Sequence, residues 1–139
     1  ANVQLMKLEL TALRAAEFIV RTEGEFDVFN GQAGVGMIDC IEAGCRGFIP
    51  GAETGDISSL IYSLYNAGDE AARQQAVDLY KDILPLWHMI MESIDTLLIY
   101  GKPLLSKRIG LDQSRIREPH GQTTAFGNAR LAALSSFLD

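Results

Sequence analysis

A single lysine lies within an apolar run near the start of the chain. In residues 3–9 (VQLMKLE), strict alternation places Val3, Leu5, Lys7 and Glu9 on one face of a β-strand. An ammonium group among apolar neighbours is costly to bury, and burial favours the neutral amine. Because a neutral amine is a nucleophile toward carbonyl carbon, Lys7 is a candidate for covalent catalysis. The alternative is a lysine on an edge strand that keeps its ammonium in water.

Three further residues lie where two later apolar runs end. Asn30 could hydrogen-bond a substrate or simply satisfy a turn, and Gly31 could let a substrate approach the backbone or serve as a turn residue. Glu53 follows the third run, where it could meet a polar substrate tail, although a solvated loop carboxylate is the simpler interpretation. These residues are therefore candidates for a binding site rather than for proton transfer.

The histidines and cysteines do not form a recognisable metal or redox motif. His88 lies in an apolar helical segment and His120 follows Pro119 in a polar stretch, and neither has a second ligand at suitable spacing. Cys40 and Cys45 have the spacing C-x4-C, which matches neither a zinc ribbon nor a C-x-x-C motif. We expect no metal, and we interpret both cysteines as reduced core residues of a cytoplasmic protein.

Composition limits the class of protein. The sequence has 139 residues, enough for one compact domain, with 47% hydrophobic and 22% charged residues. The net charge of −6 argues against a nucleic-acid partner, which would require a basic surface. No apolar run approaches the length of a membrane span, and no signal peptide is visible. The composition therefore favours a globular protein without a nucleic-acid or membrane partner.

The first half of the chain alternates strands with helices. Short β-rich runs at residues 3–9, 26–30 and 47–49 flank amphipathic helical patterns at 11–20 and 35–43. Strands joined by helices of about this length pair in parallel through right-handed crossovers. The loops that follow the second and third strands contain glycine, and such loops are where α/β proteins place their sites. We therefore expect the candidate residues at the carboxyl ends of a parallel sheet.

The second half is helical. A helix is predicted from Asp56 or Ser58 to Gly68, followed by a long pattern that starts at Asp69 and continues to Gly101. Pro85 lies within this pattern and should kink or divide it. Shorter helices are predicted at 103–109 and 124–138. We divide the chain into residues 1–67 and a helical domain at 68–139.

Sequence landmarks in a fixed order run through most of the chain. They are the strand with Lys7, residues 29–32 (FNGQ), 43–51 (AGCRGFIPG), 66–69 (NAGD), 79–86 (LYKDILPL), 100–105 (YGKPLL) and 117–119 (REP). Their order and spacing resemble the back half of the dihydrodipicolinate synthase and N-acetylneuraminate lyase family. The chain departs from the family pattern at Leu8, which separates Lys7 from Glu9, and at Pro50, which replaces a serine. These departures leave the exact substrate open and are more typical of a divergent branch than of the lysine-pathway enzyme itself.

The resemblance implies an α/β fold made of the last three units of a (β/α)8 barrel, followed by a helical domain. It places Lys7 as the Schiff-base lysine, with Asn30 and Gly31 at the substrate and the carbonyl of Ile49 near the lysine. It also implies a homotetramer and no cofactor. The family's proton-relaying tyrosine and its Thr-Thr pair precede the lysine strand, and a whole barrel takes about 250 residues. We therefore expect the sequence to be a fragment, or one part of an assembly, whose N-terminal half lies in the same or another chain.

Three functions remain open at this point. The resemblance implies a Schiff-base lyase or synthase that acts on pyruvate or a related 2-keto acid, active only with the missing half. The same scaffold also supports dehydration of a 2-keto-3-deoxy sugar acid. A helical interaction module that keeps the scaffold without its site is the non-enzymatic alternative, and its signature would be an inert Lys7.

Overall fold

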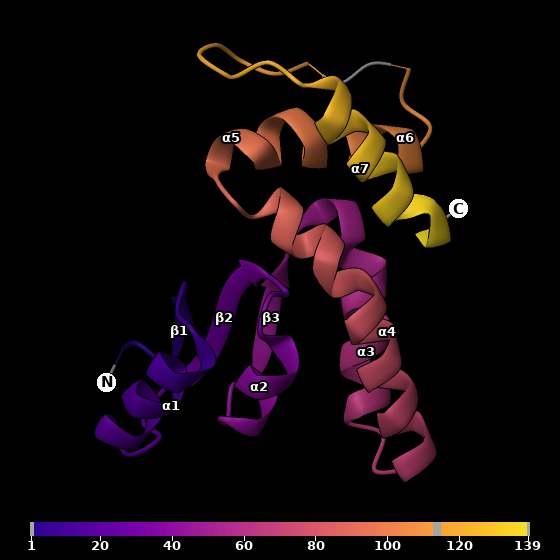
Figure 1. The fold of residues 1–139 in the computed structure, drawn as a ribbon. Helices are drawn as coiled ribbons and strands as arrows, with labels where there is room; N and C mark the ends of the chain where they lie inside the picture. Colours follow the sequence, from indigo (N-terminus) through magenta and orange to yellow (C-terminus); the bar gives the residue numbers. More distant parts are fainter. Residues whose placement is uncertain (1, 113–114, 139) are drawn as a thin grey trace.

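A three-stranded parallel sheet with the order β1-β2-β3 forms one side of the molecule in the computed structural model, which describes residues 2–112 and 115–138 (Figure 1). The strands are β1 (Leu5–Leu8), β2 (Asp27–Ala33) and β3 (Gly47–Pro50). Helix α1 (Ala12–Arg21) connects the first two, and α2 (Met37–Glu42) connects the second and third. The predicted alternation of strands and helices in a mixed α/β fold is confirmed.

The two faces of the sheet differ in their surroundings. Leu8 and Val28 point toward α1 and α2, where they pack with Ala15, Cys40 and Cys45. Both cysteines are free and buried, which agrees with the prediction of reduced core residues. The residues at alternate positions face the opposite side, which we call the open face. They are Leu5, Lys7, Phe29, Gly31, Gly47 and Ile49.

Strand β2 does not stop at Gly31 as the sequence suggested, but continues to Ala33 through an irregular register. Asn30 pairs with Phe48 and Ala33 pairs with Pro50, so two residues of β2 lie opposite Ile49 alone. Such a bulge strengthens the twist and redirects the backbone. Gln32 and Ala33 have φ values of 56° and 53°, a left-handed conformation that few residues other than glycine adopt. The strand therefore ends in a strained segment beside the candidate site.

The second half is helical, with one boundary different from the prediction. The turn η1 (Ala52–Thr54) leads into α3 (Gly55–Tyr65), and Asp69 caps α4 (Glu70–Ile90) by accepting the N–H of Ala71. Helix α4 runs through Pro85 without a break, because the buried residues around it, Ile83, Leu86 and Trp87, hold both halves against the core. The break falls instead after Ile90, where Ser93 and Thr96 form a capping box.

The remaining elements gather at the carboxyl end of α4 (Figure 1). They are α5 (Ile94–Thr96), the π-helical segment η2 (Leu97–Gly101), α6 (Lys102–Arg108), α7 (Ala125–Ser135) and the final turn η3 (Ser136–Leu138). No helix among the described residues is both long and apolar enough to cross a membrane.

The main hydrophobic core joins the two halves of the chain. It contains Met37 and Ile61 from the first half, and Ile83, Trp87 and Leu104 among others from the second. The division at residues 67 and 68 stays a prediction, and the largest buried cluster crosses it. Residues that follow β2 and lie in β3 therefore pack against the helices of the second half.

Candidate active site

Lys7 lies on the open face of β1, opposite Phe29 of β2. Its side chain is 45% exposed, and its Nζ donates to the carboxylate of Glu9. The expected burial among Val3 and Leu5 is not found in the part of the chain that the structure describes, where each of these two residues is 54% exposed. Lys7 is thus held by an ion pair rather than by an apolar pocket.

The Glu9 carboxylate has a second hydrogen-bond donor besides Lys7. Its Oε2 accepts the backbone N–H of Gln32 at 2.8 Å, in the left-handed end of β2. The hydrogen bond from Lys7 lowers the pKa of the Glu9 carboxyl, against the opposing effect of desolvation, and the Gln32 N–H lowers it further. Glu9 is therefore an ionised carboxylate that bridges the ends of two neighbouring strands.

Gly31 makes room for this carboxylate. A Cβ at Gly31 would overlap the carboxyl group of Glu9, so any other residue would displace the Glu9 side chain. The sequence offered two roles for Gly31, close approach of a substrate or a turn. The structure adds a third, because the space above Gly31 is occupied by a side chain of the protein itself.

Asn30 does not join this group. It pairs with Leu8, so its side chain points into the helix-covered face, where it is 0% exposed. Its Nδ2 donates to the carbonyl of Leu10 at 2.8 Å and to Sγ of Cys40 at 2.8 Å, and its Oδ1 accepts the N–H of Leu10. These bonds tie the loop after β1 to α2. A hydrogen bond from Asn30 to a substrate stays a prediction that this orientation does not support.

Ile49 lies on the open face of β3, opposite the bulge of β2, and its side chain is 45% exposed. Lys7, Glu9, Gly31 and Ile49 thus share one face near the carboxyl ends of the three strands. The predicted placement of the Ile49 carbonyl near Lys7 stays a prediction. The structure groups three of the four predicted site residues on one face and adds Glu9 to them.

Glu53 differs from its expected role as a solvated loop carboxylate. It is 4% exposed in η1, and its Oε1 has no hydrogen-bond partner among the described residues. Glycine at positions 51 and 101 leaves space for its carboxyl group, and the guanidinium of Arg108 holds its backbone carbonyl at 2.6 Å. Because Gly101 and Arg108 come from distant segments, only the fold reveals this burial.

Next to Glu53, Thr54 connects the end of the sheet to α4. Its Oγ1 accepts the indole N–H of Trp87 at 2.7 Å, and both residues are 0% exposed. The indole ring fills the space above Gly34, where a Cβ would lie 2.7 Å from Cη2 of Trp87. The loops after β2 and β3 are therefore anchored on the same tryptophan.

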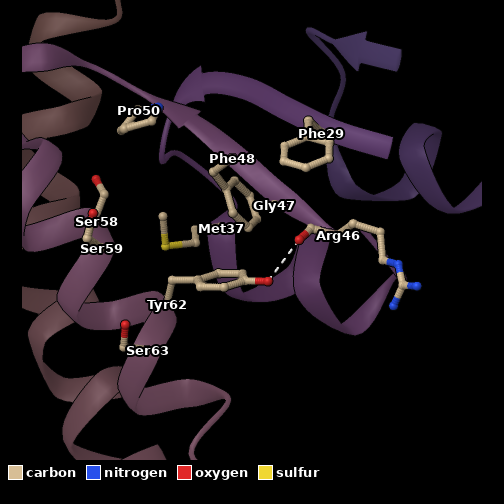
Figure 2. A pocket seen from close by; sticks show the side chains of 10 residues that line it. All are labelled: Phe29, Met37, Arg46, Gly47, Phe48, Pro50, Ser58, Ser59, Tyr62 and Ser63. Carbon is tan, nitrogen blue, oxygen red and sulfur yellow. Dashed lines mark hydrogen bonds between the residues drawn. The ribbon is translucent and has the colours of Figure 1, made fainter. Parts of the chain in front are cut away.

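A groove of about 290 Å³ runs between β3 and α3 (Figure 2). Figure 2 shows the hydroxyl of Tyr62 aimed at the carbonyl of Arg46, to which it donates at 2.8 Å. Phe29, Met37 and Phe48 add apolar surface, and three serines lie along the side formed by α3. The groove lacks the ion-paired lysine that distinguishes the open face, which is the better candidate for chemistry.

The histidines lie away from this face. His88 is on α4 and His120 follows Pro119, and the described residues contain no cluster of three or more potential metal ligands. Sequence reasoning placed Glu9 on the same strand face as Lys7 but gave it no role in the site. The signal that could have identified it is the spacing of two from Lys7, which puts both residues on one face of a strand.

Comparison with known proteins shows a likeness of fold. No family model matches the sequence, and no curated protein matches it. The structure is similar to that of dihydrodipicolinate synthase from Rhodopseudomonas palustris, with a TM-score of 0.76 and 23% sequence identity. The match covers 94% of this chain and 44% of that enzyme, so the chain spans less than half of its length.

Proposed function

We propose that the chain contributes the lysine of a Schiff-base lyase or synthase that acts on pyruvate or another 2-keto acid. The observation that carries the proposal is Lys7 on the open face of β1, in a fold similar to dihydrodipicolinate synthase. Three parallel βα units with helices on one side form a segment of a (β/α)8 barrel, whose other five strands lie in the same or another chain. In such a barrel the open face lines the interior, and active sites form at the carboxyl ends of the strands.

The chemistry follows from the amine. Deprotonated Nζ of Lys7 attacks the ketone carbon of the keto acid, and loss of water gives an imine. The imine withdraws electrons from the adjacent carbon, so a proton or carbon substituent there leaves more easily. The enamine then adds to an aldehyde, or the reverse cleavage occurs. This route requires neither a metal nor an organic cofactor. Dehydration of a 2-keto-3-deoxy sugar acid is the alternative use of the same imine.

The placement of Lys7, rather than burial of its ammonium group, supports the proposed catalytic role. An apolar strand presents the side chain toward the proposed barrel interior, and the Glu9 carboxylate fixes the position of Nζ near the strand end. Closure of the barrel would cover Leu5 and Ile49, which are exposed here. We also propose a homo-oligomer, a tetramer as the family resemblance implies, with no nucleic-acid or membrane partner.

The test is reductive trapping in the complete gene product that contains these residues. The protein is incubated with pyruvate and borohydride, which reduces an imine to a stable amine, and its intact mass is measured. We expect the mass of one reduced pyruvyl unit, located by peptide mapping on the peptide that contains Lys7. Lys7→Met should abolish labelling, whereas Lys81→Met, which removes an exposed lysine of α4, should not.

Labelling that persists in Lys7→Met would assign the chemistry to another lysine. If the wild-type protein takes up neither pyruvate nor other 2-keto acids, the lyase proposal is wrong, and the non-catalytic interaction module becomes the better interpretation.

A further inference from the structure

The Lys7–Glu9 pair contains both groups that imine formation needs. Nζ of Lys7 contacts the carboxylate of Glu9, and the same carboxylate accepts the Gln32 N–H at 2.8 Å. Because Gly31 has no Cβ, the carboxyl group of Glu9 fits between the ends of β1 and β2. Although Glu9 is 55% exposed, two hydrogen bonds from different strands define the direction of its oxygens. The carboxylate is therefore directed at the reacting nitrogen.

Imine formation requires two proton movements at this point. An ammonium has no lone pair, so Lys7 must lose a proton before it attacks a carbonyl. The carbinolamine that results must then lose its hydroxyl group, which leaves readily only as water. A single group next to Nζ can perform both tasks if it first takes a proton and later returns it.

We propose that Glu9 is a further acid–base catalytic residue, which acts directly at the nitrogen of Lys7 during imine formation and is additional to the proton-relaying tyrosine that the family resemblance implies; the inference rests on the proposed Schiff-base function. The Glu9 carboxylate takes one proton from the Lys7 ammonium, and the free amine forms the N–C bond to the ketone carbon. A second proton moves from nitrogen to the former carbonyl oxygen, which gives the neutral carbinolamine. The Glu9 carboxylic acid then protonates the hydroxyl group, the C–O bond breaks, and one water leaves. The products are the protonated imine and the Glu9 carboxylate, so protons and charge balance.

The ionised resting state of Glu9 is compatible with this cycle. The largest cause of its lowered pKa is the hydrogen bond from Lys7. When the nitrogen of Lys7 becomes neutral, the electrostatic part of this stabilisation disappears and the carboxylate becomes more basic. Glu9 can then hold the proton until the carbinolamine is formed. When the imine nitrogen becomes positive again, the carboxylate form is favoured once more.

The test measures the rate of trapping in the complete gene product, with pyruvate as the probe and borohydride added at timed intervals. Glu9→Gln keeps the size of the side chain but removes its ability to exchange a proton. We expect imine formation about 100-fold slower, the lower range for loss of a general acid–base group, with the same final labelling at Lys7. Glu17→Gln, which removes an exposed carboxylate of α1 paired with Arg14, is the matched control and should react at the wild-type rate.

A second variant separates proton transfer from positioning. In Glu9→Ala the carboxylate is missing, and added formate should restore part of the rate, whereas a purely structural role of Glu9 would not respond to formate. The inference is overturned if Glu9→Gln traps pyruvate at the wild-type rate or faster, or if formate has no effect on Glu9→Ala. Wild-type protein that is not labelled at all would instead remove the proposed function, and with it this inference. The two failures are thus distinguishable.

Discussion

Thr54→Val should weaken the packing between the end of the sheet and α4. The substitution replaces a hydroxyl by a methyl group of similar size, so it leaves no cavity but removes the acceptor of the Trp87 indole N–H. Both residues are 0% exposed, so water cannot replace the hydroxyl without a local opening. The ring has little freedom to turn toward another acceptor, because it lies against the backbone of Gly34, where a Cβ would be only 2.7 Å from Cη2.

The expected cost is that of a buried donor without a partner, about 1–3 kcal/mol. With a urea dependence of about 2 kcal/mol per molar, a loss of about 2 kcal/mol moves the unfolding midpoint down by about 1 M. The chain contains one tryptophan, so fluorescence during urea unfolding reports directly on this position.

The control is Thr123→Val, which makes the same chemical change at an exposed threonine. It should alter the free energy of unfolding by less than about 0.5 kcal/mol. An unchanged urea midpoint in Thr54→Val would refute the reasoning, because it would mean that the indole N–H finds another partner or contributes nothing to stability.

Two other predictions concern titratable groups. Hydrogen bonds from Arg108 at 2.8 and 2.6 Å lower the pKa of Asp56. The pair therefore stabilises the folded protein fully when the pH is above the ordinary pKa of an aspartate. This stabilisation is lost as the pH falls through the lowered pKa of Asp56. Asp56→Asn should therefore reduce the free energy of unfolding at pH 7 by less than about 1 kcal/mol, since Asp56 is 61% exposed. On acidification to about pH 3, this variant should lose less stability than the wild type or the control Asp82→Asn. Equal losses of stability in urea titrations of the three proteins would contradict the prediction. Burial raises the pKa of the Cys45 thiol to about 11, with Cys40 adding to the effect. At pH 8 the thiolate fraction of Cys45 is then roughly 200-fold below that of an ordinary cysteine. Iodoacetamide should therefore modify Cys45 only after the protein unfolds. Rapid modification of the native protein, measured by mass spectrometry, would contradict the burial.

Local patterns in the sequence were sufficient for the order of elements. Strand and helix periodicities predicted the alternation in the first half and the helical second half, because each pattern follows from backbone geometry within a few residues. Alternation also put Lys7 and Glu9 on one face. Pro85 shows the limit of local rules, because burial of its neighbours keeps α4 continuous where proline alone predicts a kink or a break.

The contents of the candidate site depended on tertiary structure. Alternation within one strand cannot say which face is covered by helices, so the burial of Asn30 became visible only from its pairing with Leu8. The bulge in β2 presents the Gln32 N–H to Glu9, and a bulge is set by the pairing of two strands rather than by either alone.

The sequence by itself therefore determined which elements form and that a lysine and a carboxylate share one strand face. Only the tertiary structure decided which polar groups are paired, buried or left without a partner. Glu53 illustrates the reason, because Gly101 and Arg108, which lie against it in the fold, are far from it in the sequence. Periodicity is a property of neighbouring residues, whereas the partners of a polar group are supplied by whichever distant segments the folded core brings to it.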